Sequence, residues 1–136
     1  MTVLFLSDSK NEAKNLLLRV LYMIVPKNKI TLINDVGELE YHLRQQLHDN
    51  SIAVLLPANI SEMTAIIALK GIFGDMPIIL IMPDRQNNTI SLGYKLRPRF
   101  ITYADSDFLD VAEVITRLNF KADNLYDKQK DIKGGN

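Results

Sequence analysis

The stretch Met76–Asp84, MPIILIMPD, decides the fold because it holds an unbroken apolar run with no polar face. A strand that is apolar on both faces is typical of a parallel sheet with helices on both sides. The run follows a helical segment, Ser61–Phe73, which we expect to stop at Gly74 with a left-handed C-cap. Pro77 then opens the strand.

Four more apolar runs with strand character lie on either side of this one, and helical segments separate them. Several of these runs are also continuous rather than alternating, which again indicates burial on both faces. The sequence therefore predicts an α/β fold with a doubly wound, five-stranded parallel sheet in the order 2-1-3-4-5 and five helices. The five expected strands are Val3–Leu6, Ile30–Ile33, Ile52–Leu56, Ile78–Met82 and Phe100–Tyr103.

Start signals mark the first two helices. Ser9 is followed three residues later by Glu12, and Asp35 is followed in the same way by Glu38. This spacing is that of a capping box, in which the two side chains satisfy backbone N–H groups at the helix start. We expect one helix to begin at each pair.

The last two helices differ in the strength of their signals. The segment Asn88–Leu96 contains Gly93, so we expect a short or loosely packed helix there. The final helix has a clear start, with Asp107 as its cap and Asp110 at the third position, and its apolar spacing extends it to about Lys128.

Composition indicates one domain over residues 1–127, followed by a polar linker or disordered tail over 128–136. The 136 residues are 47% hydrophobic, enough for a substantial core, and 16 basic and 16 acidic residues cancel. A neutral domain has no general attraction to nucleic acid or anionic membrane. Cysteine is absent, which excludes disulfides and thiolate chemistry. The N-terminal apolar run is too short for a signal peptide, so we expect a cytoplasmic protein.

Function in such a sheet gathers at the carboxyl ends of the strands. In this arrangement the chain resembles the receiver domains of bacterial response regulators over roughly residues 2 to 125. The resemblance implies an acidic pair, a phospho-acceptor aspartate, a hydroxyl residue and a lysine at these ends. The positions are held here by Ser7 and Asp8, by Pro57, by Met82, and by Tyr103 or Ala104. Only Asp8 matches, so we expect a degenerate phospho-acceptor pocket, no enzyme activity, no cofactor and no metal.

A narrower resemblance is to the atypical N-terminal receivers of FleQ-type flagellar master regulators. The stretches that carry it are Ala53–Asn59, Met76–Pro83 and Arg117–Tyr126. It implies a dimerising regulatory domain of a bacterial transcription activator, in which an AAA+ ATPase module and a DNA-binding domain follow. Receivers commonly pair through the side formed by their fourth helix, fifth strand and fifth helix. The candidate interface there comprises Leu92, Tyr94, Arg97, Tyr103, Val114 and Phe120.

Two alternatives stay open. The chain could be a stand-alone adaptor, or a module that binds a small anionic ligand or nucleotide in the strand-end crevice. The basic cluster over residues 94–99 is interpreted as a solvated face or a protein contact, because a neutral domain with one short basic stretch is weak support for nucleic-acid binding.

Overall fold

The sheet has five parallel strands in the order β2-β1-β3-β4-β5, as predicted. The computed structural model describes residues 1–8, 12–45 and 50–119. Along the sheet, Leu6 of β1 pairs with Ile33 of β2 and with Leu55 of β3, so the carboxyl ends of these strands are level. The strands are β1 (Thr2–Leu6), β2 (Ile30–Ile33), β3 (Ser51–Leu55), β4 (Ile78–Met82) and β5 (Phe100–Tyr103).

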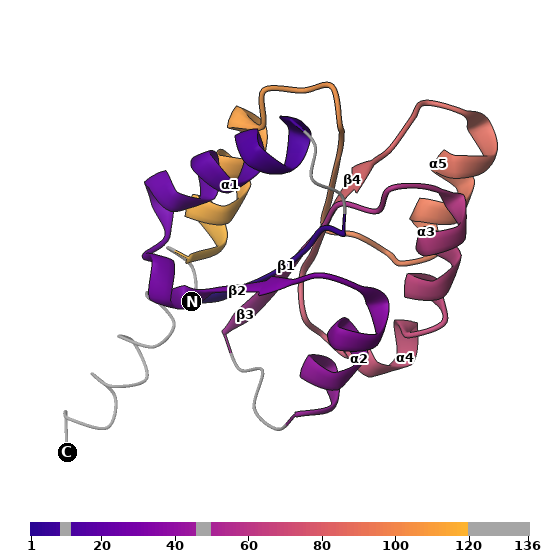
Figure 1. Ribbon diagram of the computed structural model, residues 1–136, viewed down its shortest axis with the longest axis horizontal. Coiled ribbons are helices and arrows are strands. Elements are labelled where there is room, and N and C mark those ends of the chain that lie inside the picture. The colour runs from indigo at the N-terminus through magenta and orange to yellow at the C-terminus, as the bar shows by residue number, and fades with distance from the viewer. Residues whose placement is uncertain (9–11, 46–49, 120–136) are drawn as a thin grey trace, which may run out of the picture.

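Helices cover both faces of the sheet (Figure 1). On one face lie α1 and a helix over residues 109–119, here called the C-terminal helix. On the other face lie α2, α3, α4 and α5. The bounds are α1 (Glu12–Ile24), the 3₁₀ turn η1 (Lys27–Lys29), α2 (Val36–Arg44), α3 (Ile60–Ile67), α4 (Lys70–Phe73) and α5 (Asn87–Tyr94).

Each central strand contributes to two hydrophobic cores. In β1, Val3 and Phe5 pack with α1 and the C-terminal helix, whereas Leu4 and Leu6 pack with α2 and α3. All five residues of β3 and of β4 are buried. Continuous apolar runs are therefore required, because a polar side chain on either face would lose its water without gaining a partner.

Capping places the starts of α2 and α3. Asp35 Oδ1 accepts a hydrogen bond from Glu38 N at 2.7 Å, which confirms the predicted cap, and Glu38 Oε2 accepts from Asn34 N at 2.9 Å. In α3, Asn59 Oδ1 accepts from Glu62 N at 2.9 Å, so this helix begins at residue 60 rather than 61. The expected cap at Ser9 lies outside the described residues.

The structure has two helices, α3 and α4, in place of the single helix predicted over residues 61–73, so the prediction of one continuous helix was wrong. Leu69 N bonds to Ile66 O, three residues back instead of four, and Leu69 is buried. This tighter turn ends α3 and lets Leu69 and Phe73 of α4 both reach the core. Gly74 has φ +58° as expected, but its ψ of −130° is not that of a left-handed helical cap.

Gly93 shows that α5 is short, as predicted, but closely packed. A Cβ at this position would collide with Met82 Sδ and Cε and with Leu80 Cδ2. Gly93 thus lets α5 approach the end of β4, so of the two predicted alternatives, a short or a loosely packed helix, the structure has the short one.

The C-terminal helix begins after the loop that follows β5. Asp107 Oδ1 accepts from Leu109 N at 3.0 Å, but the carbonyl of Phe108 accepts the first helical bond, from Ala112 N at 3.1 Å, so Phe108 rather than the predicted Asp107 is at the N-cap position. Phe108 is fully buried with φ +62°, an uncommon conformation for a residue with a side chain. The expected extension to Lys128 and the tail over 128–136 lie outside the described residues. None of the helices in the described part of the chain has the length and apolar character that crossing a bilayer requires.

Candidate functional site

Ser7 and Asp8 lie at the carboxyl end of β1, between the ends of β2 and β3. Ser7 N donates to Ile33 O at 3.0 Å, and Leu56 N donates to Leu6 O at 2.9 Å, so the ladder continues past the strand ends. Ser7 is buried and its carbonyl accepts from Lys14 Nζ at 3.4 Å, whereas Asp8 is exposed. At the carboxyl end of β1, in the strand-end crevice, Asp8 rather than Ser7 is therefore the residue whose side chain is accessible.

Glu62 lies beside Asp8 and interacts with it through their carboxyl groups. Glu62 was not predicted as a site residue from the sequence. It occupies the third position of α3, where the Asn59 cap orients the first turn toward the crevice. Burial of its carboxyl group, and then hydrogen bonding with and repulsion from Asp8, raise the pKa of Glu62 from 4.5 to about 7. A backbone hydrogen bond at Ala58 lowers the pKa, and the charge of Asp35 raises it further.

The carboxyl group of Glu62 therefore holds its proton up to near neutral pH, because burial and the adjacent Asp8 disfavour its ionised form. Glu62 Oε1 is buried without a hydrogen-bond partner among the described residues. The spacing of Asn59 and Glu62 repeats that of Asp35 and Glu38, and this capping-box pattern is the signal that could have placed Glu62 at the crevice.

Pro57 and Met82 supply no reactive group to the crevice. Pro57 is buried two residues past the end of β3, at the position where the receiver resemblance expects a phospho-acceptor carboxylate, and proline has no nucleophilic side chain. Met82 is fully buried at the end of β4 and packs against Gly93. The space beside β4 is thus filled by a thioether and the backbone of α5.

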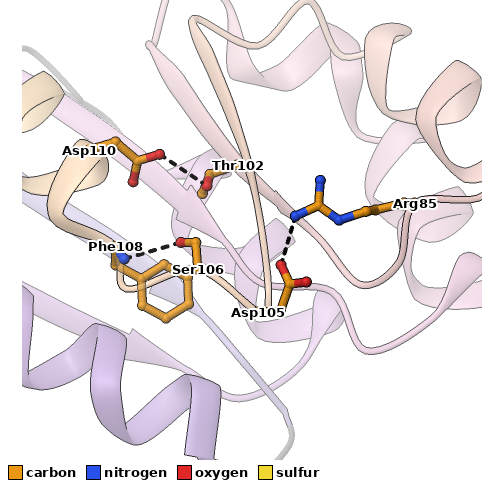
Figure 2. Close-up of polar contacts among 6 residues, drawn as sticks. All are labelled: Arg85, Thr102, Asp105, Ser106, Phe108 and Asp110. Atoms are coloured by element: carbon orange, nitrogen blue, oxygen red, sulfur yellow. Dashed lines mark hydrogen bonds and ion pairs between the residues drawn. The ribbon is translucent and has the colours of Figure 1, made fainter.

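Tyr103 and Ala104 line a shallow cavity of about 460 Å³ at the ends of β4 and β5, together with Met82. Arg85, from the loop after β4, also lines it and was not identified from the sequence. Its guanidinium lies 3.9 Å from the centre of the Tyr103 ring. Arg85 also forms an ion pair with Asp105 Oδ1 at 2.9 Å (Figure 2). Arg85 therefore brings a cation to this end of the sheet, and Asp105 already neutralises it.

The loop between β5 and the C-terminal helix is fixed by its own hydrogen bonds, which Figure 2 shows. Ser106 Oγ accepts from Phe108 N at 3.1 Å, which supports the positive φ of Phe108. Thr102 Oγ1 in β5 donates to Asp110 Oδ2 at 3.2 Å. Asp110 thus bonds across to the sheet in addition to its place in the first helical turn, so the end of β5 is held to the C-terminal helix.

The crevice residues predicted from the sequence form two groups. The first comprises Ser7 and Asp8, which adjoin Glu62, and the second comprises Met82, Tyr103 and Ala104, which share the cavity with Arg85. Among the described residues, no group of three or more histidine, aspartate or glutamate side chains is arranged to hold a metal ion.

The predicted interface residues differ in exposure: some are on the surface and others are half-buried against the two cores. Tyr94 on α5 has 63% of its surface exposed, and Arg97 is exposed in the following loop. Leu92 and Tyr103 are half-buried against the core beneath α2 and α3, and Val114 against the core beneath α1. Phe120 lies outside the described residues. The exposed members are therefore on α5 and the loop before β5.

In comparisons with known proteins, no family model, curated protein or solved structure matches this chain.

Proposed function

We propose that this chain is a non-phosphorylatable, receiver-like regulatory domain that acts through protein contact on the side formed by α5 and β5. The observation that carries the proposal is buried Pro57 at the end of β3 in a sheet of order 2-1-3-4-5. A phosphoryl acceptor in this position needs a carboxylate nucleophile, and proline cannot supply one.

The surroundings of Pro57 support the same conclusion. Phosphoryl transfer requires cations that neutralise the charge on the phosphoryl oxygens. Here two carboxyl groups, those of Asp8 and Glu62, adjoin the crevice, and carboxylate charge repels a phosphate. Lys14 lies at the same end of β1, where its Nζ donates to the Ser7 carbonyl oxygen at 3.4 Å. Arg85 is engaged by Asp105 at the other end of the crevice.

Incubation with acetyl phosphate and Mg²⁺, followed by intact-protein mass spectrometry, tests the loss of chemistry. We expect the mass to stay unchanged, and the melting temperature to stay unchanged when beryllofluoride and Mg²⁺ are added. A mass increase of one phosphoryl group that is absent from the Asp8→Asn variant would contradict the proposal.

Light scattering over a concentration series tests the contact surface. We expect a reversible dimer that Tyr94→Ala weakens at least about tenfold, because a central exposed aromatic commonly contributes more than 1 kcal/mol to an interface. Tyr41→Ala is the matched control, since Tyr41 on α2 is equally exposed at 63% and belongs to another helix. Equal dimerisation of both variants and the parent chain, or no dimer at any concentration, would refute self-association through this side.

If the FleQ-type resemblance holds, the same side regulates AAA+ and DNA-binding modules of a bacterial transcription activator. Joining this chain to AAA+ and DNA-binding modules of such an activator, and measuring ATP hydrolysis with and without Tyr94→Ala, tests this extension. An identical rate would contradict it.

A further inference from the structure

A second concave site lies at the opposite end of the sheet, at the amino ends of β4 and β5. It is a cavity of about 300 Å³ formed where α4, the turn before β4 and the loop before β5 meet. Its lining includes Phe73 and Leu96, both nearly fully buried. The floor is therefore apolar and continuous with the core beneath α2 and α3.

The rim of this cavity carries an excess of positive charge. Lys70, Arg97 and Arg99 line it, and Asp75 is the one acidic residue among the lining residues. Among the described residues the ion pairs within 4 Å are made by Arg44, Arg85 and Arg117, so none of the three rim cations has a carboxylate partner there. Three like charges around one concavity repel each other, and an anion would relieve that repulsion.

The loop that presents two of the cations is held in place before any ligand binds. Arg97 N donates to Tyr94 O at 3.0 Å, and Arg99 N donates to Ile78 O at 2.8 Å. Arg97 has φ +51°, a conformation that glycine or asparagine adopts more readily than arginine. A fixed loop costs less ordering entropy on binding, which favours a site over a merely solvated surface.

We propose that this cavity binds a small phosphomonoester, with the phosphate held by Arg97, Arg99 and Lys70 and the apolar body placed against Phe73 and Leu96. Guanidinium groups match the geometry of phosphate oxygens, and the volume is at the lower limit of small-molecule pockets. The cations surround a hollow in a domain of zero net charge, whereas nucleic acid is bound by an extended basic surface. The site is separate from the crevice, and it shares Arg97 with the predicted interface on α5 and the loop before β5.

Phenyl phosphate is the probe, because it joins a phosphate to an apolar ring. Backbone NMR titration of the whole chain should show saturable shifts at the amides of Gly74, Arg97 and Arg99. Inorganic phosphate, which lacks the ring, and benzyl alcohol, which lacks the charge, should each bind at least about tenfold more weakly, because either part of the contact is then missing.

Arg97→Gly is the decisive variant, since glycine accepts the positive φ and the whole side chain with its guanidinium is removed. We expect binding of phenyl phosphate to weaken at least about tenfold, because one charge-assisted hydrogen-bonding contact is lost. The melting temperature should be unchanged or raised, because glycine adopts the positive φ without strain. Lys95→Gln is the control, because Lys95 belongs to the same basic segment but does not line the cavity, and its affinity should match that of the parent chain. Lys70→Gln should also weaken the binding of phenyl phosphate, and it tests the contribution of α4 independently of the loop that carries Arg97.

Three results would overturn the proposal. One is a titration without saturable shifts at these amides. Another is equal affinity of the parent chain and Arg97→Gly, which would show that the guanidinium takes no part. The third is tighter binding of a hexaglutamate peptide than of phenyl phosphate at the same amides, which would identify an acidic protein segment as the occupant.

Discussion

Replacing Glu62 with glutamine should stabilise the protein above neutral pH and flatten its stability profile. The pKa of Glu62 is raised from 4.5 to about 7 in the folded state, so the folded chain binds more protons than the unfolded chain between these values. The free energy of unfolding must then fall as pH rises through this window and stay low above it. Glutamine cannot ionise, and its amide can still donate to Asp8.

The size of the effect follows from the shift. Each pKa unit corresponds to about 1.4 kcal/mol, so the full shift would set a ceiling of roughly 3 kcal/mol. Glu62 is only partly buried, and solvent screening reduces the expected gain to about 1 kcal/mol at pH 8. At pH 4.5 or below, where Glu62 is protonated in the folded chain, the variant and the parent should be nearly equal.

Urea denaturation at several pH values between 4.5 and 8 measures this directly. Glu40→Gln is the matched control, because Glu40 forms an exposed pair with Arg44 on α2 at 3.5 Å. It should lower stability by less than about 0.5 kcal/mol at every pH. A Glu62→Gln variant whose stability tracks that of the parent across this range, with no gain at pH 8, would refute the raised pKa of Glu62.

Three further predictions concern stability and are also tested by urea denaturation. Gly93→Ala should cost about 1 to 2 kcal/mol, because the clash with Met82 outweighs the gain in helix propensity; a stabilised variant would contradict the close approach of α5. Asp35→Ala should cost about 1 kcal/mol through loss of the α2 cap, and Asp35→Ser should recover most of it. Arg85→Gln should cost less than about 1 kcal/mol, because its contacts with Asp105 and the Tyr103 ring are exposed, and a larger loss would show a structural role.

Features that depend on local sequence were predicted well. The apolar run of β4 indicates burial on both faces without knowledge of its neighbours, and the structure buries every residue of it. The Asp35 cap is similarly local, because donor and acceptor are three residues apart. These two kinds of signal are enough to predict the parallel sheet and its helices.

Features that depend on contacts between distant segments were missed. The pairing of Glu62 with Asp8 requires the loops after β1 and β3 to meet, and the sequence alone shows Glu62 as an ordinary helix acid. Gly93 was interpreted by its helix propensity, although its position is decided by Met82 on another element. The break between α3 and α4 has the same origin, because it is the core that requires both Leu69 and Phe73.

The two ends of the sheet differ in how far their charges are compensated within the chain. At the carboxyl end, Arg85 is paired with Asp105 and Glu62 is neutralised by a proton near pH 7. At the amino end, Arg97 and Arg99 face a cavity without a carboxylate partner in the described residues. Folding alone gains nothing from gathering uncompensated like charges around a hollow. The amino end is therefore where an external anion would change the free energy of unfolding most, and α5, which carries Tyr94, ends directly before that loop.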